Sequence, residues 1–238
     1  MKNIKINGSE LTFSQVEHIV RGQVNISLDK YVKKRVSAAQ KIIKKAVDGK
    51  KQIYGVTTGF GALSGTFISS DKRKRLQRNI ILSHSAGVGE CFDEEIVRSI
   101  MLLRINDLAK GHSGISFGTL QTLVEMLNKR VHPVIPEKGS VGASGDLAPL
   151  AHLALVLIGE GKAVFKDKSL SGKKAMKSAA IALRELEAGE GLALINGTQA
   201  MTGIGAIVVA DAIKLLKSSD IAAGMSLEVL LGSVIYLN

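Results

Sequence analysis

The chain has 238 residues, enough for one large domain or two small ones, and the absence of tryptophan means that aliphatic side chains must build most of any core. The single cysteine, Cys91, excludes an intramolecular disulfide and suits a reducing cytosol. The net charge of +11 would suit nucleic-acid binding, but the lysines are spread over several expected helix faces and aromatic residues make up only 4% of the chain, so a solvated basic surface is favoured and nucleic acid is not expected as a partner.

In chain order, the first expected element is a small β-hairpin over residues 2–12, with Asn7 and Gly8 as its turn. Two helices should follow, because apolar side chains recur at steps of three and four up to a terminating glycine. They span residues 14–21 and 29–47. The segment 54–65 is rich in Gly, Thr and Ser and should be an irregular loop.

The middle of the chain is expected to be helical on both sides of a turn-rich stretch. Three helices are predicted from apolar side chains at steps of three and four, and Ser70 or Asp71 can cap the first of them. They run from Ser70 or Asp71 to 83, from 93 to 110 and from 116 to 129. Pro133 and Pro136 then break the chain before a glycine-rich run. Asp146 can cap the helix that follows, and the first turn of that helix tolerates Pro149.

The last third should begin with a hairpin over residues 162–173 whose turn lies at 167–169. Helices are then predicted over 174–187, over 199–217, and from a cap at Ser219 or Asp220 to 231. The helix over 199–217 is apolar around much of its circumference and should be a buried central helix. The pattern indicates one mainly α domain over residues 1–238.

Membrane and metal partners are not expected from the sequence. No apolar run reaches membrane-spanning length without interruption, and the N-terminus has no signal-peptide core. The spacing of His18, His112 and His132 does not suggest a metal site. His152 is expected to be a buried or capping residue of its helix.

The tripeptide Ala143-Ser144-Gly145 lies in the run GSVGASGDLAPL at residues 139–150. Three small residues let the backbone fold back until the amide nitrogen of Gly145 reaches the carbonyl carbon of Ala143, so that a five-membered ring can close. Loss of water from that ring and of the Ser144 hydroxyl would leave a strongly electrophilic alkene conjugated to a carbonyl. The same tripeptide also suits a turn into a helix or an anion-binding nest. A serine-hydrolase elbow is excluded because the second glycine of G-x-S-x-G is missing.

Further motifs cover nearly the whole chain. They are YGVTTGFG at 54–61, QRN at 77–79 with SHSAGVG at 83–89, and GLALINGTQ at 191–199. Together with the run at 139–150, and in this order, they resemble the aromatic amino acid ammonia-lyases, the family of histidine, phenylalanine and tyrosine ammonia-lyases. The resemblance implies a mainly α fold, the N-terminal portion of the fumarase/aspartase-like helical fold of that family, with small β-hairpins.

The resemblance also implies the chemistry. The expected reaction is non-oxidative elimination of ammonia from an aromatic amino acid. The resemblance is strongest to the histidine branch, which implies L-histidine as the substrate and urocanate as the product. Ala143, Ser144 and Gly145 would cyclise to a protein-derived 4-methylideneimidazol-5-one (methylidene-imidazolone), with no metal. Tyr54 matches the base that removes the β-proton, although by itself it could be a half-buried loop aromatic. Asn196 would donate its amide to the imidazolone or to the substrate carboxylate, and it could also cap a helix N-terminus.

The remaining site residues are implied by the same match. Gly61, His84 and Leu147 correspond to positions that line the family's substrate pocket, and Asp146 is expected to support the cofactor loop. His84 favours the histidine branch, because members that act on phenylalanine tend to be apolar at this position and a polar ring suits a hydrogen bond to imidazole or phenol.

Members of this family are about twice this length, so the chain resembles an N-terminal half. The other half would carry a second catalytic tyrosine, the arginine that binds the substrate carboxylate, and much of the bundle that builds a homotetramer. The chain could therefore be a cytoplasmic lyase acting in a homotetramer or with a complementary C-terminal chain, or an inactive or split half-chain that serves as an assembly subunit. A tyrosine or phenylalanine ammonia-lyase or an aminomutase of the same family also remains open.

Overall fold

The computed structural model describes residues 3–22, 24–49, 51–59, 61, 64–233 and 235, and most of these residues are helical. Lys2 of the first predicted hairpin and Phe60 of the motif at 54–61 lie outside these residues. The helices are α1 Phe13–Arg21, α2 Val32–Asp48, α3 Ser70–His84, α4 Glu94–Leu108, α5 Phe117–Asn128, α6 Leu147–Leu157, α7 Gly172–Ser178, α8 Glu190–Ile195 and α9 Gln199–Val229. The strands are β1 Asn3–Ile6, β2 Asn25–Leu28, β3 Val88–Cys91, β4 His132–Pro133, β5 Pro136–Lys138, β6 Lys162–Phe165 and β7 Lys168–Ser171.

Side-chain caps begin two of the central helices where the sequence predicts. The Asp93 carboxylate accepts a 2.8 Å hydrogen bond from a first-turn amide of α4, and the Ser116 hydroxyl accepts a 3.2 Å bond from a first-turn amide of α5. The predicted caps of α3 are wrong, because Ser70 and Asp71 are already helical and Ser69 precedes the helix.

The predicted N-terminal hairpin is wrong. Strand β1 pairs in parallel with β2, with Ile6 opposite Leu28, so α1 is the crossover between two parallel strands. The Asn7 side chain accepts hydrogen bonds from the amides that follow it, which turns the chain toward α1 instead of back along β1. The amide of Asp29 still donates to the carbonyl of Ile6, at 2.9 Å, and α2 therefore begins at Val32 rather than at residue 29.

The second predicted hairpin is present as β6 and β7, although its turn lies at Lys166 and Asp167 rather than at 167–169. Both residues have a positive φ, 51° and 59°, as a two-residue hairpin turn requires. Strand β4 pairs with the other edge of β6, so the strand with two partners in this small sheet is β6.

The helix predicted over 174–187 ends at Ser178. Ala180 adopts a φ of 51°, and the amide of Ile181 donates to the carbonyl of Met176 at 2.9 Å, which closes the end of α7. The chain beyond is irregular and buries Ile181 and Leu186 in the core. The free energy gained by burying these two apolar side chains outweighs the helix propensity of the segment.

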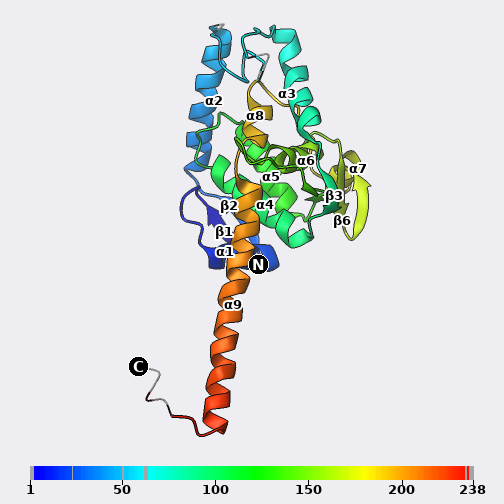
Figure 1. Cartoon of the computed structure of the whole chain (residues 1–238). Coiled ribbons are helices and arrows are strands. Elements are labelled where there is room, and N and C mark those ends of the chain that lie inside the picture. The colour runs from blue at the N-terminus through cyan, green and yellow to red at the C-terminus, as the bar shows by residue number, and fades with distance from the viewer. Residues whose placement is uncertain are drawn as a thin grey trace.

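The core is centred on α4, which contacts α1, α5 and α9. Helix α8 contacts both α3 and α6. Figure 1 shows α2 and α3 at one end of the molecule, with α8 between them and α4, α5 and α6 below. This arrangement brings the segments before and after α8 next to the start of α6, where the Ala-Ser-Gly loop ends.

Helix α9 runs without a break through Ser219 and Asp220, so the predicted helix end at 217 and the predicted cap at either of these residues are wrong. The hydroxyls of Ser218 and Ser226 donate to the carbonyls of Lys214 and Ala222, four residues earlier. These bonds give both hydroxyls an acceptor inside the helix, so neither serine caps the start of a new helix.

The prediction of a buried helix holds only for the first part of α9, where buried side chains up to Ala210 face α1 and α4. Leu215 and Leu216 are 73% and 64% exposed, and the rest of α9 extends away from the other helices (Figure 1). By length and composition alone the segment Glu190–Val229 could span a membrane, contrary to the expectation from the sequence, although 39% of its most apolar window is buried. Core helices of soluble proteins pass the same test, and Asp211 on α9 pairs with Arg21 of α1.

Candidate active site

The Ala-Ser-Gly loop connects β5 to α6. Ala143 and Ser144 are exposed, whereas Gly145 is buried and has a φ of 148°. A β-carbon at Gly145 would lie 2.9 Å from Oδ1 of Asn196 and equally close to the backbone of Gly197. The structure therefore brings together the two motifs that carry the implied electrophile and the implied asparagine, and the approach leaves no room for a side chain at residue 145.

Asp146 binds this loop to the asparagine segment, which is the motif at residues 191–199 that contains Asn196. Its amide donates to the carbonyl of Gly197 at 2.7 Å, and its carboxylate accepts hydrogen bonds of 2.8 Å from the hydroxyl of Ser140 and from the amide of Met201. The expectation that the Asp146 side chain caps α6 is wrong, since Asp146 precedes α6 but makes no side-chain bond to it. Met201 lies in the first turn of α9, so the carboxylate satisfies an amide there instead.

Asn196 is exposed and follows the last residue of α8. It therefore does not cap a helix N-terminus, and Thr198 precedes α9 instead. The amide nitrogen of Asn196 donates to the carbonyl of Leu192 at 3.0 Å, which fixes its backbone to the end of α8. The side chain is consequently held at a helix end, beside Gly145, and not on a free loop.

Arg104 of α4 donates hydrogen bonds to the asparagine segment, a role that the sequence does not predict. Its guanidinium donates to the carbonyls of Ala193 and Asn196, the latter at 3.1 Å, and to Oε1 of Gln199 at 2.7 Å. Burial lowers the pKa of Arg104 to about 10, so the group stays protonated at neutral pH. Its charge lies at the C-terminal end of α8, where a cation is stabilising.

Tyr54 and Gly61 lie together, as the motif implies. The Tyr54 hydroxyl oxygen accepts a 3.2 Å hydrogen bond from the amide of Gly61, and the ring is 55% exposed. The next residue packs tightly on α8, because a β-carbon at Gly55 would lie 2.6 Å from Cδ2 of Leu192. The tyrosine loop and the asparagine therefore share one support, the short helix α8.

Gln77 of α3 links the tyrosine loop, the segment that follows Tyr54, to α8. It belongs to the motif at 77–79, but the sequence predicts no function for this residue. The side chain is fully buried. Its Oε1 accepts from the amide of Gly191 at 2.9 Å, and its Nε2 donates to the carbonyl of Gly55 at 3.5 Å. Both groups of the amide thus have a partner, one on each of the two segments.

His84 is the last residue of α3 and is half-buried. Its Nδ1 lies 2.8 Å from the carbonyl of Ile80, which makes Nδ1 the protonated nitrogen in that bond. Strand β3 follows α3 closely and pairs with β5, the strand before the Ala-Ser-Gly loop. Leu147, also half-buried, begins α6 and packs against the core. The structure thus places both residues on elements next to the loop.

His152 of α6 joins these elements, and it is half-buried and bonded to another segment rather than buried in or capping its own helix as predicted. Its Nε2 accepts a 3.1 Å hydrogen bond from the amide of Gly87, in the segment between α3 and β3. Burial lowers the pKa of His152, which favours the neutral ring that this bond requires. Across the described ranges, no group of three or more His, Cys, Asp or Glu side chains could hold a metal ion.

The family model described as aromatic amino acid lyase matches residues 11–237. A histidine ammonia-lyase of Alkaliphilus oremlandii is 54% identical over 98% of this chain, and the match covers 46% of that relative. The chain thus spans about half the length of the curated relatives it matches.

Two solved structures resemble this chain along most of its length. The histidine ammonia-lyase of Trypanosoma cruzi has a TM-score of 0.92 at 37% identity, and the match covers 99% of this chain and 46% of that one. The phenylalanine aminomutase of Pantoea agglomerans has a TM-score of 0.86 at 36% identity, with 92% and 42% covered. The mainly α fold that the sequence predicts is therefore found in both a lyase and an aminomutase.

Proposed function

The chain belongs to the aromatic amino acid lyase family, and on that premise we propose that it forms the cofactor-bearing part of an enzyme that eliminates ammonia from L-histidine to give urocanate. The observation that carries the proposal is the contact of the Ala-Ser-Gly loop with the asparagine segment, in which a β-carbon at Gly145 would lie 2.9 Å from Oδ1 of Asn196. The identity of 54% to a histidine ammonia-lyase supports histidine as the substrate.

The residues of the loop fit a methylidene-imidazolone formed from Ala143, Ser144 and Gly145. Ring closure needs small residues and a strained backbone at Gly145, and both are present. Closure joins the Gly145 nitrogen to the Ala143 carbonyl carbon with loss of one water, and Ser144 loses a second. The group would supply the electrophile that activates the amino acid for loss of ammonia. Asp146 would hold it through its bonds to Ser140 and Gly197.

The remaining residues would bind the substrate and move its proton. We assign removal of the β-proton to the Tyr54 oxygen, where the amide of Gly61 donates a hydrogen bond that stabilises negative charge. The Asn196 amide would donate to the substrate carboxylate or to the loop. His84 and Leu147 would line the pocket for the ring, together with Gly61. The N-terminus of α6 begins directly after the loop, so its first amides favour negative charge that develops there.

Intact mass of the purified chain tests the loop, and urocanate absorbance tests the reaction. We expect a mass lower by two waters, and an unmodified mass in Ser144→Ala. We expect turnover of histidine when a second polypeptide supplies the other half of the enzyme. A folded, modified chain that gives no urocanate with such a partner would contradict the histidine assignment. A rearranged amino acid as the product would indicate an aminomutase instead.

A second candidate function is favoured by the exposed apolar side chains of α9. Leu215, Leu216 and Ile221 are each more than half exposed, and large apolar side chains gathered on an exposed helix often mark an interaction surface. In this case the chain serves as an assembly subunit, either of a homotetramer or of a complex with a complementary C-terminal chain. It predicts a soluble cytoplasmic oligomer whose 238 residues behave as one domain and whose mass shows no loss of water. Sedimentation and mass measured on the same sample separate the two functions.

A further inference from the structure

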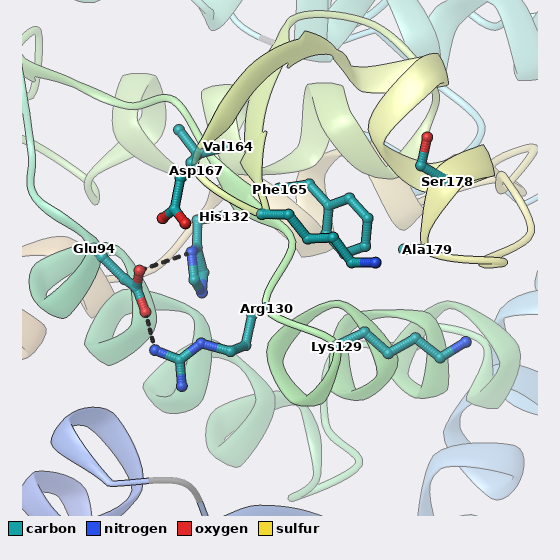
Figure 2. Close-up of a pocket in the computed structure, with 10 residues that line it drawn as sticks. Glu94, Lys129, Arg130, His132, Val164, Phe165, Asp167, Ser178 and Ala179 are labelled. Carbon is teal, nitrogen blue, oxygen red and sulfur yellow. Dashed lines mark hydrogen bonds and ion pairs between the residues drawn. The ribbon is translucent and has the colours of Figure 1, made fainter.

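A second candidate binding site lies away from the residues discussed above. A cavity of about 510 Å³ is bounded by the start of α4, the end of α5, strand β4, the β6–β7 hairpin and the end of α7 (Figure 2). Its walls contain none of the residues assigned to the lyase reaction. The volume falls within the range of small-molecule sites in proteins, about 300–1,000 Å³.

Charges of opposite sign line different parts of this cavity. Figure 2 shows the carboxylates of Glu94 and Asp167 toward one side, where the guanidinium of Arg130 pairs with Glu94, and the amine of Lys129 toward the other. Lys166 also lines the cavity, and its Nζ lies 5.5 Å from the centroid of the Phe165 ring. An apolar wall of Val164, Phe165 and Ala179 completes the lining.

His132 contributes no charge to the cavity at neutral pH. The ring is buried, its Nδ1 lies 3.5 Å from Oε2 of Glu94, and its Nε2 lies 3.4 Å from Nη1 of Arg98. Because an arginine can only donate, Nε2 must accept and the proton resides on Nδ1. Burial lowers the pKa of His132 to about 4, consistent with this neutral form.

The two carboxylates differ in how they are already engaged. Glu94 is held by His132 and by an ion pair with Arg130. Asp167 makes neither a hydrogen bond nor an ion pair within the residues that the structure describes. Its exposed carboxylate, at the tip of the β6–β7 turn, is therefore available to a ligand.

We propose that this cavity binds a small zwitterion, an ω-amino acid or a short peptide with an ammonium group at one end and a carboxylate at the other. The ammonium group faces Asp167, the carboxylate that pairs with none of the described cations lining the cavity. The carboxylate of the ligand faces Lys166 and Lys129, and Nζ of Lys129 also donates a 2.9 Å hydrogen bond to the carbonyl of Ala180. The methylene chain lies along the apolar wall.

Calorimetric titration of the 238-residue chain tests the pairing of both charges. The probes are 6-aminohexanoate, hexanoate and hexylamine, which share one chain length and carry both charges or only one. None of them has an amine next to a carboxylate, so none is a substrate for the proposed elimination, and the result is independent of that function. We expect 6-aminohexanoate to bind about tenfold more tightly than either single-charge probe. Equal binding of all three, or no binding, would overturn the proposal.

Substitutions then locate the site. Asp167→Asn should weaken binding of 6-aminohexanoate roughly fivefold, and Lys166→Gln should do the same, because each removes one exposed charge pair. Asparagine tolerates the positive φ at residue 167, so the turn is kept. Lys168→Gln is the matched control on the same hairpin, outside the cavity lining, and should leave binding unchanged. If neither cavity variant weakens binding more than this control does, the site lies elsewhere and the proposal is wrong.

Discussion

The side chain of Asn196 occupies the space that a side chain at Gly145 would need. A β-carbon at residue 145 would be 2.9 Å from Oδ1 of Asn196. Residues 145 and 196 are separated along the chain by α6, α7 and α8. Their contact is consequently a property of the folded chain and depends on the packing of α8 against α6.

The contact predicts that Gly145→Ala prevents ring closure. The methyl group would meet Asn196 and Gly197, and the φ of 148° is one that alanine rarely adopts. We expect the intact mass of this variant to show no loss of water. Gly142→Ala is the control in the same loop, where φ is also positive but nothing lies within 4 Å of the added carbon. A mass lower by two waters in Gly145→Ala would refute the fit of this loop to the cofactor.

Arg104→Met should disorder the asparagine segment. The change removes hydrogen bonds to Ala193, Asn196 and Gln199, and these acceptors, of which only that of Gln199 is buried, lose this partner. We expect the free energy of unfolding, measured in urea, to fall by roughly 3 kcal/mol or more. The loss of two waters should also disappear from the intact mass.

Arg98→Met separates a local effect from a general loss of stability. Arg98 is also buried on α4, and it donates to the carbonyls of Ile19, Val20 and Leu127, away from the Ala-Ser-Gly loop. This variant should be destabilised to a similar extent and yet keep the modification. If both variants keep it, Arg104 does not position the site.

Gln77→Leu should loosen the tyrosine loop. The leucine would keep the volume but leave the amide of Gly191 and the carbonyl of Gly55 without their partner. Such unpaired buried groups cost about 1–3 kcal/mol each. We expect faster amide hydrogen exchange over residues 53–59 and unchanged exchange in α5. Equal protection of the loop in the variant and the parent chain would show that Gln77 does not hold it.

The sequence predicts well those features that depend on local chemistry. Asp93 and Ser116 begin helices because their side chains bond to amides within the next turn, and this pattern is contained in a few residues. The motifs likewise indicate which loops carry the site. Neither signal says which segments will meet in space.

The features that the sequence does not predict depend on distant partners. Strand β1 alternates as a strand should, but the choice between a hairpin and the parallel partner β2 is made by the packing of α1. Arg104 has a recognisable signal, because it shares a face of α4 with the buried residues Ile100 and Leu108. A charge on such a face requires buried acceptors, although their identity is visible only in the fold.

His132 should make the stability of the chain depend on pH. Burial lowers its pKa from 6.5 to about 4. Between these values the unfolded chain binds a proton that the folded chain does not, so the free energy of unfolding falls as the pH falls from about 6.5 toward 4. The full difference corresponds to roughly 3 kcal/mol. Above pH 7 this contribution is complete and constant.

Urea unfolding of the parent chain and of His132→Gln at several pH values measures this contribution. Glutamine can accept from Arg98 and donate to Glu94 without titrating, so the variant should lose part of the pH dependence. His152→Gln is the comparison, because burial lowers the pKa of His152 in the same direction. Identical profiles for the parent chain and His132→Gln would contradict the assignment.

The exposed part of α9 should cause the chain to self-associate when no other chain covers it. Leu215→Lys with Leu216→Lys replaces two exposed apolar side chains by residues that favour a helix, so the fold should be kept. We expect sedimentation velocity to show less association than in the parent chain and urea unfolding to change by less than about 1 kcal/mol. Ile207→Lys, on the buried part of the same helix, should unfold the chain instead, because it places a charge in the core. Unchanged association in the double variant would mean that this face of α9 is not the surface through which the chain assembles.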